Sequence, residues 1–564
     1  RLLAGKPSPE AQLEAGWHLV HTTEELRGAD LLAKIAPSWV ERRVSMAVAV
    51  PALERALEIY TRHDRPLAER LHLRSLLVMS SFLFDHRLAS RHAEATLDGL
   101  FPFTGLGLAE RWSRSIGKAA AFGLAVVWTF LRWTVQPRKT RGPHVFDAIK
   151  YYARASMGLV GLRALAVDVA GVMAAFERMR AFDGVPHSTL QILYALSKAI
   201  SLHMQGRSAE APTLIQTVLD RLGPHNKVPM QMNEAERTDV LSGALLLEGI
   251  NECYRERSKA LSYVKRLEEL GTPLAVAAAM RISMSYYMLR GETERTQHFR
   301  RLLDLSAIQN GTVWQIDWIA VPIEGLAGMI WSDLVMMRRA VDALAKLSSS
   351  EPAFAGMRDT IRVGYLFRRG DFAAVVRGAD DYMKAHPPFR QIGWASAYAQ
   401  ISLSYLELGD TERALAISKG AFELLNEHHL RYVVHHSTLE AAYAAALVAS
   451  GQRERGEEMF RVLIERLRAS GEHTRAFLMH EYRVKVARLI GDRTAVRGAL
   501  KDMRDAALAS GNPSAILLAN TVSELRARAR SSPLPPAKQE VERPETFSVT
   551  RGEETVVTAF LRAE

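Results

Sequence analysis

The chain has 564 residues and a formal net charge of +11, which is the small difference between 73 basic and 62 acidic side chains. Hydrophobic residues make up 48% of it, ample for a buried core, and the single cysteine, Cys253, excludes an internal disulfide and fits a reducing compartment. A basic balance can favour nucleic acid, but no helix-turn-helix, zinc-finger or RNA-binding signature accompanies it. We therefore assign most of the charge to solvated helix surface, expect no nucleic-acid partner, and expect a cytoplasmic location.

The first part of the chain, residues 1–100, has the pattern of helical pairs with weak periodicity. It starts at Arg1 in sequence that is already helical, so we expect the chain to be a segment of a larger protein. No sustained alternation of apolar and polar residues occurs between Leu13 and Arg530, whereas helical spacing is common. The predicted fold class is all-α.

An irregular segment, residues 101–144, interrupts this pattern. Its apolar run, residues 119–131, has basic residues on both sides, at Arg111, Arg114, Lys118, Arg132, Arg138, Lys139 and Arg141. The thirteen residues of this run fall short of the roughly 20 that a membrane-spanning helix needs. We expect a buried helix; attachment to an anionic membrane surface is the second interpretation, and a membrane span is the third.

Glycines recur at a near-constant interval through the main array, residues 145–530. Intervals of 39, 42 and 40 residues separate the last four, and the earlier intervals of 85 and 79 each correspond to two periods. The six are Gly206, Gly291, Gly370, Gly409, Gly451 and Gly491. Because glycine adopts the positive φ that often follows a helix without steric cost, we place each at the turn inside a pair of helices. The two missing turns fall near Arg255 and Ser332.

The residues around these glycines keep a common register. Apolar residues stand four positions before and twelve positions after each glycine. Five positions after, where two helices must approach closely, the residue is mostly small or β-branched, as at Ala414 and Gly456. Aspartates follow three of the glycines, at Asp371, Asp410 and Asp492, and can cap the next helix. A period of about 40 residues predicts an α-solenoid, a superhelix of stacked antiparallel helix pairs.

The known catalytic motifs fail on inspection. Gly117 and Lys118 would end a phosphate-binding loop, but Trp112 stands where that loop needs a glycine. No dinucleotide-fold, zinc-protease, kinase or metal-ligand motif is present, so we expect no catalytic residue, no cofactor and no metal in this chain. A histidine cluster at His428, His429, His435 and His436 is assigned to polar residues around a turn rather than to a metal site.

Aromatic residues mark the region where a surface for a ligand or partner is predicted. Tyr286, Tyr287, Trp314, Trp318 and Trp331 lie in or beside the most apolar and least repeat-like portion of the array. Large aromatic side chains also fill irregular helix packing, and that is the favoured interpretation; a pocket on the concave face is the alternative. Residues 531–564 are assigned to a proline-rich linker and tail.

The repeats around Gly409 and Gly451 resemble tetratricopeptide repeats. The small, aromatic, turn, small and small positions of that family fall on Ser402, Tyr405, Gly409, Ala414 and Ala421. The period here exceeds the usual 34 residues, so no peptide-binding residue is carried over. The resemblance implies a surface that binds a protein partner or a small-molecule effector.

The N-terminal sequence resembles the helical segment that follows the ATPase in certain bacterial signalling proteins. These combine a serine/threonine kinase or another effector with a nucleotide-switch ATPase of the AAA/STAND type and a long tetratricopeptide-like region. The matching residues are Ala15, Gly16, Trp17, His18, Gly28 and Ala29. The resemblance implies a non-catalytic sensor and scaffold region that regulates ATPase or kinase domains upstream of Arg1. The alternatives are the helical sensor arm of an ATP-dependent transcriptional activator and an unrecognised all-α enzyme.

Overall fold

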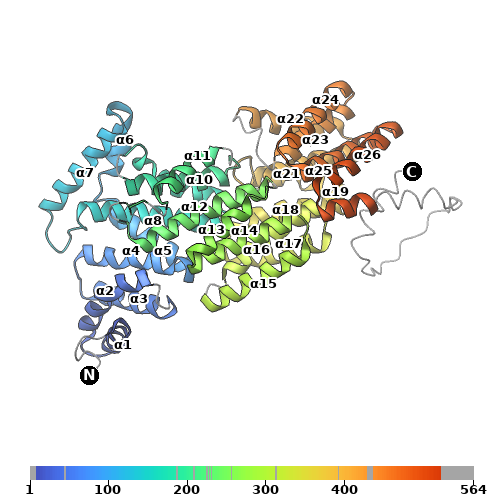
Figure 1. Cartoon of the computed structure of the whole chain (residues 1–564). Coiled ribbons are helices and arrows are strands. Elements are labelled where there is room, and N and C mark those ends of the chain that lie inside the picture. Colours follow the sequence, from blue (N-terminus) through green and yellow to red (C-terminus); the bar gives the residue numbers. More distant parts are fainter. Residues whose placement is uncertain are drawn as a thin grey trace. The chain divides into compact units, whose positions relative to one another are not determined.

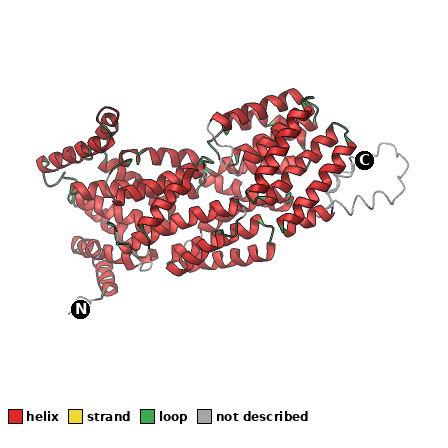
Figure 2. Ribbon diagram, turned by 45° about the horizontal axis from the view of Figure 1, so that its top comes forward, coloured by secondary structure: helices red, strands yellow, loops and turns green. Residues whose placement is uncertain are grey.

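The computed structural model describes residues 8–42, 46–185, 188–207, 210–223, 226–227, 229, 232–255, 257–310, 314–391, 393–427 and 436–521. Every regular element in these ranges is a helix, as Figure 2 shows, and none of the ranges contains a strand. The all-α prediction is confirmed. The predicted linker and tail, residues 531–564, lie outside the described residues.

The residues group into two compact units. Unit 1 comprises residues 1–248, 265–279 and 303–316, and unit 2 comprises residues 249–264, 280–302 and 317–564. The helices wholly in unit 1 are α1 (Pro9–Leu19), α2 (Glu25–Arg42), α3 (Met46–Arg62), α4 (Leu67–Phe84), α5 (His86–Leu100), α6 (Leu106–Ile116), α7 (Lys118–Val135), α8 (Val145–Leu165), α9 (Val169–Glu177), the 3-10 helix η1 (Arg180–Phe182), α10 (Ser188–Met204) and α11 (Ala211–Arg221) (Figure 1).

Five helices contribute residues to both units, namely α12 (Glu234–Tyr254), α13 (Ala260–Leu270), α14 (Pro273–Leu289), α15 (Thr293–Asn310) and α16 (Trp314–Trp331). The helices wholly in unit 2 are α17 (Leu334–Ser350), α18 (Phe354–Arg368), α19 (Phe372–Arg377), α20 (Ala379–Ala385), α21 (Trp394–Glu407), α22 (Thr411–Glu427), α23 (His436–Ala449), α24 (Arg453–Ala469), α25 (His473–Leu489) and α26 (Arg493–Ser510). The segment boundaries expected from the sequence at residues 100, 144 and 530 stay predictions.

The six array glycines lie in turns between helices, where the repeat register places them. Their φ angles are all positive, from 68° to 89°. In each turn, the residue after the glycine donates a hydrogen bond from its amide to the carbonyl of the residue four positions before the glycine. These hydrogen bonds are 2.8–3.0 Å long. This is the Schellman arrangement, which satisfies a carbonyl that the ending helix leaves free. The same six-residue closure therefore recurs through both units.

The two turns without a glycine end a helix in the same way. Ser332 has a φ of 59° between α16 and α17, and the amide of Asp333 donates a 3.0 Å hydrogen bond to the carbonyl of Gly328. Between α12 and α13, the amide of Arg257 donates a 3.0 Å hydrogen bond to the carbonyl of Glu252. Amides in the first turn of the next helix donate to the predicted aspartate caps, Asp371, Asp410 and Asp492.

In unit 2 the first helices of successive pairs pack against one another. α18 contacts α21, α21 contacts α23, and α23 contacts α25, while α22, α24 and α26 each contact their own pair partner. The middle of this row is densely packed, because every residue from Leu439 to Val448 is buried. Close approach depends on small residues: Ala414 is fully buried, and a Cβ on Gly456 would lie 2.6 Å from Cγ2 of Val448.

The end of unit 2 also contacts its beginning. The hydroxyl of Ser514 donates a 3.1 Å hydrogen bond to the carbonyl of Gly291, in the turn between α14 and α15. These residues are 223 positions apart. The contact is therefore not one between neighbouring repeats.

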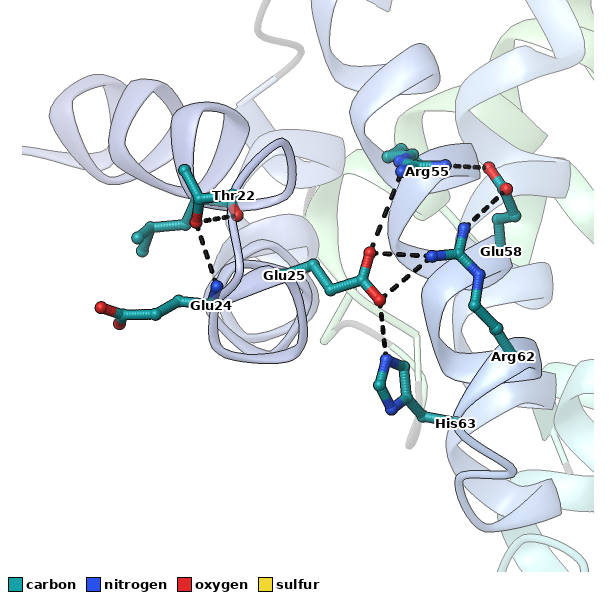
Figure 3. A network of polar contacts seen from close by, with 8 residues as sticks. Thr22, Glu24, Glu25, Arg55, Glu58, Arg62 and His63 are labelled. Atoms are coloured by element: carbon teal, nitrogen blue, oxygen red, sulfur yellow. Dashed lines mark hydrogen bonds and ion pairs between the residues drawn. The ribbon is translucent and has the colours of Figure 1, made fainter.

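The first helices of unit 1 are joined by close packing and by an ion-pair network. α1 packs on α2, where a Cβ on Gly16 would lie 2.7 Å from the Leu32 side chain. Glu25, at the start of α2, lies 2.9 Å from the Arg62 guanidinium of α3 and 2.8 Å from Nε2 of His63 (Figure 3). The hydrogen bond with His63, aided by Arg62, lowers the pKa of Glu25. The network fastens α2 to α3.

The apolar helix of the irregular segment is largely exposed, so the expectation that it is buried is wrong. Only Ala121, Ala125 and Thr129 are buried in α7. These small side chains form a narrow packed face, and the larger apolar residues of the helix lie outside it. Among the described residues, no helix combines the length and apolar character needed to cross a membrane.

Candidate ligand cavity in unit 2

A cavity of about 110 Å³ lies within unit 2. Its lining residues come from seven helices, α12, α14, α16, α18, α21, α23 and α25. No lining residue comes from the helices that separate these seven along the chain. The cavity is therefore built from helices that are not consecutive in the sequence.

Two positions of the repeat supply much of the polar wall. Ser396 and Thr438 both lie 13 residues before their turn glycine, and their hydroxyls are 3.3 Å apart. Gln400 and Tyr482 both lie nine residues before theirs. The other wall residues with a hydroxyl are Tyr254, Ser285, Ser437 and Thr474.

The rest of the wall is mostly apolar. Its apolar residues are Leu289, Ile323, Leu326, Met329, Ile330, Leu478 and Met479, and the remaining lining residues are Cys253, Arg368 and Arg475. Apolar walls with a few converging polar groups are the usual form of a small-molecule site. An engineered apolar cavity of about 150 Å³ binds benzene, so this one has room for a molecule of a few heavy atoms.

Three buried polar atoms at the wall have no hydrogen-bond partner in the part of the chain that the structure describes. They are Oε1 of Gln400, Oγ of Ser285 and Nε of Arg368. Gln400 is 4% exposed and Ser285 is 5% exposed. Leaving a buried donor or acceptor unsatisfied costs about 1–3 kcal/mol, and most such groups in folded proteins are paired. These atoms are where a bound molecule would gain hydrogen bonds.

Arg368 on α18 is held by a carboxylate on α25. Its guanidinium donates to Glu481, which also lies 3.3 Å from Nζ of Lys485. Burial alone would raise the pKa of Glu481, but the charges of Arg368 and Lys485 outweigh burial and lower this pKa to about 2. The carboxylate is therefore ionised at neutral pH.

Arg475, the second arginine of the wall, is paired as well. Its guanidinium donates to the carboxylate of Glu472 and to the backbone carbonyl of Tyr254. Both arginines of the wall therefore have a carboxylate partner. A ligand would meet balanced charges rather than an uncompensated positive site.

Cys253 lines the cavity without the character of a nucleophile. Its side chain is buried, and its thiol donates a weak 3.6 Å hydrogen bond to the carbonyl of Ile282. Burial raises the pKa of this thiol, whereas a reactive cysteine needs a lowered one. The residue is a small buried wall group.

The five aromatic residues proposed from the sequence do not line this cavity. Tyr286 and Tyr287 contact each other, with ring centroids 5.2 Å apart, and Trp318 packs edge-on against Phe354. The indole of Trp331 donates a 3.2 Å hydrogen bond to the carbonyl of Met288. These contacts are internal packing, and a role in binding stays a prediction.

The fifth aromatic, Trp314, belongs to unit 1, where its ring contacts that of His86. The sequence nevertheless pointed to two of the helices that form the cavity. Ser285 lies on α14 beside the two tyrosines, and Met329 lies on α16 two residues before Trp331. The predicted aromatic residues thus share helices with some of the lining residues but do not line the cavity themselves.

The histidine cluster is described at one position only. His428, His429 and His435 lie outside the described residues, and His436 is buried at the start of α23. Across the ranges that the structure describes, no group of three or more His, Cys, Asp or Glu side chains is placed to hold a metal ion.

Comparisons with models of known protein families and with curated proteins find no match. The likeness to tetratricopeptide repeats and to bacterial signalling proteins therefore stays a prediction from the sequence.

Proposed function

We propose that this chain is a ligand-sensing α-solenoid of the tetratricopeptide-like type, and that the cavity of unit 2 is its binding site. The observation that carries the proposal is a pair of buried polar atoms on the cavity wall, Oε1 of Gln400 and Oγ of Ser285, which have no hydrogen-bond partner among the described residues. The recurrent turns and the packing of first helix on first helix support the solenoid.

The wall favours a small molecule with an apolar body and one polar head. Oε1 of Gln400 needs a donor, whereas Oγ of Ser285 can donate or accept. Because both wall arginines already have carboxylate partners, the head is expected to be neutral or singly charged. A primary amide or an alcohol on a short aliphatic chain meets these requirements, and a carboxylic acid does so only if it binds in its protonated form.

The proposed place of this region is beside regulated domains in a larger bacterial signalling protein. A molecule in the cavity would contact helices that are not consecutive in the sequence, so it would stabilise one arrangement of those helices over others. That change could be transmitted to a kinase or nucleotide-switch ATPase upstream of Arg1, or to a protein partner. A DNA-binding domain after Glu564 would instead favour the sensor arm of a transcriptional activator.

The binding test is a thermal-shift screen of the purified chain. The probes are short aliphatic carboxylic acids, the matching primary amides and the matching alcohols. A probe at one hundred times its Kd stabilises the folded state by about 2.7 kcal/mol, which a melting curve detects. Gln400→Leu should abolish the shift, whereas Gln216→Leu, on the exposed side of α11, should keep it. The proposal fails if no probe shifts the melting temperature or if Gln400→Leu responds like the parent.

The absence of catalysis is tested separately. We expect the purified chain neither to hydrolyse ATP nor to transfer phosphate, because it has no phosphate-binding loop or kinase motif. The measurement is phosphate release and radiolabel transfer at saturating ATP. Turnover that a single substitution inside the chain abolishes would show that the region is an enzyme.

A further inference from the structure

The exposed side of α7 carries a continuous apolar stripe. Leu124, Val127, Trp128, Leu131 and Val135 recur at i, i+3, i+4, i+7 and i+11, a spacing that puts them on one face of a helix. Each is between 46% and 79% exposed. We call these five residues the α7 stripe.

The segment that contains the α7 stripe holds more exposed apolar surface than its length explains. Of the nineteen large hydrophobic side chains that are exposed in the described part of the chain, ten lie in residues 101–146. A folded monomer rarely leaves a large contiguous apolar patch in water. The concentration therefore marks this segment as an interaction surface.

The hairpin of α6 and α7 is held by a different face. Ala121 and Ala125 of α7 pack against Ala109 of α6. The amide of Gly105 donates a 2.9 Å hydrogen bond to Oγ1 of Thr129. In Figure 1 and Figure 2 the hairpin projects from the other helices of its unit. Folding of the hairpin thus uses the small residues and leaves the α7 stripe uncovered.

The charged residues on both sides of the α7 stripe in residues 111–146 are all basic. Residues 111–146 contain seven lysines and arginines and no aspartate or glutamate, so these 36 residues supply +7 of the net +11. Lys118 and Lys139 form ion pairs with carboxylates elsewhere in unit 1. Arg111 and Arg138 are exposed and have no ion pair with any residue that the structure describes. The segment therefore attracts an anionic surface.

We propose that the α6–α7 hairpin docks on an anionic lipid bilayer, with α7 lying in the interface and its stripe at the acyl boundary. The apolar stripe accounts for insertion, and the basic residues account for selection of anionic headgroups. Trp112 and Trp128 are about half exposed, and tryptophan favours the membrane interface. This inference is independent of the cavity in unit 2.

Other occupants explain only half of these observations. A nucleic acid would account for the charge but not for the apolar stripe, and an apolar protein partner would account for the stripe but not for the one-signed charge. Crossing the bilayer does not fit either, because α7 has 18 residues and is about 27 Å long, short of the roughly 30 Å hydrocarbon core.

The test is flotation of the purified chain with vesicles of two compositions, phosphatidylcholine alone and phosphatidylcholine mixed equally with phosphatidylserine. The parent should float with the mixed vesicles only. Val127→Ser with Leu131→Ser should weaken partitioning at least about tenfold, since burying one such side chain contributes about a factor of ten or more. Leu305→Ser with Ile308→Ser, an equally exposed pair on α15, should not change it.

The charge is tested in the same assay. Arg111→Gln with Arg138→Gln should weaken partitioning about fivefold for each charge removed. Arg338→Gln with Arg339→Gln removes the same charge from α17, where both residues are exposed, and should have no effect. Circular dichroism melts of all variants should match the parent, since every substituted side chain is exposed.

A second measurement tests whether Trp128 enters the lipid. Bromine-labelled lipid in the mixed vesicles should quench part of the tryptophan fluorescence. Trp128→Phe should remove part of the quenching, whereas Trp17→Phe, another exposed tryptophan, should not.

Four results would overturn the proposal. One is no flotation of the parent, and another is equal flotation with both vesicle types. A third is a chain dimer that the serine pair on α7 dissociates, which would assign the stripe to a second copy. The fourth is binding to duplex DNA that depends on Arg111 and Arg138, together with flotation that does not.

Discussion

Arg368 and Glu481 lie 113 residues apart and form an ion pair that joins α18 to α25, the first helix of the third pair after it. Their side chains are 11% and 9% exposed. A buried charge is costly when its partner is removed, because desolvation is then uncompensated. The pair thus makes the packing of α18 and α25 sensitive to single substitutions.

Glu481→Gln is expected to lower the free energy of unfolding by about 3–5 kcal/mol, because it leaves Arg368 buried without a carboxylate. Urea unfolding followed by circular dichroism gives the value. The double variant Arg368→Met with Glu481→Leu should recover part of the loss, since Arg368 no longer leaves an unpaired buried charge, while Lys485 still loses its contact with Glu481. Equal losses in the single and the double variant would contradict this account.

The same pair predicts an acid limit to stability. The pKa of Glu481 is about 2 in the folded protein against 4.5 for a free side chain. Its contribution is therefore fully present above pH 4.5 and is lost as the pH falls through 2. In Glu481→Gln the loss of stability over that range should be smaller than in the parent, which unfolding curves at successive pH values measure.

Ser285→Ala and Ser402→Ala should differ although both serines are buried. Oγ of Ser285 has no partner among the described residues, whereas the hydroxyl of Ser402 donates a 2.9 Å hydrogen bond to the carbonyl of Ala414. Without ligand, Ser285→Ala should leave the free energy of unfolding unchanged or raise it, and Ser402→Ala should lower it by about 1 kcal/mol. A loss at Ser285 as large as that at Ser402 would show that Ser285 is satisfied inside the protein.

Ala414→Phe should destabilise unit 2 by about 1–3 kcal/mol through overpacking. Ala414 is fully buried in α22, at the close approach to α21. Ala416 lies on the same helix and is exposed, so Ala416→Phe should leave the melting temperature close to that of the parent. The comparison of the two melts separates overpacking from the lower helix propensity of phenylalanine.

His480 should make stability fall as the solution is acidified. It is buried between Arg468 and Arg483, and burial, reinforced by Arg483, lowers the pKa of its imidazole from 6.5 to about 4. Between pH 6.5 and about 4, the imidazole is protonated in the unfolded chain but stays neutral in the folded chain. The free energy of unfolding therefore decreases as the pH is lowered from 6.5, and it levels off below about pH 4. The full effect is roughly 3 kcal/mol.

The check is the pH dependence of unfolding in His480→Gln. This variant should lose less stability than the parent between pH 6.5 and 4, whereas His18→Gln, an exposed site on α1, should follow the parent. His92 titrates in the same window, so the difference between curves is the relevant quantity. Parallel curves for His480→Gln and the parent would contradict the assignment.

The helix pairs could be predicted from the sequence because their turns depend on local chemistry. Each turn needs a backbone conformation that glycine adopts at little cost, and the apolar residue four positions earlier supplies the carbonyl that closes it. Ser332 shows the limit of this signal, since it takes a positive φ without being glycine. There the break in helical spacing, rather than the residue type, marked the turn.

The cavity and the exposed helix could not be predicted in the same way. Ser396, Thr438 and Gln400 are polar residues in otherwise apolar first helices, and only the spatial overlay of repeats shows that they meet at one wall. The aromatic residues gave a stronger signal in sequence but pack against their neighbours. The apolar sequence of α7 is compatible with a helix buried in the protein, a helix in contact with lipid and a helix exposed to water. The sequence pattern alone therefore could not predict which of these environments α7 has.

The contacts of Arg475 with Tyr254 and of Ser514 with Gly291 give unit 2 a closed topology. In an open repeat array each pair contacts only its neighbours, so the ends fray and the array can melt in stages. Here residues more than 220 positions apart are hydrogen-bonded to each other, and loss of the segment that contains Ser514 also removes a contact of the early turn at Gly291. Unit 2 is therefore expected to unfold in one cooperative transition, with amide hydrogen exchange as slow at its ends as at its centre.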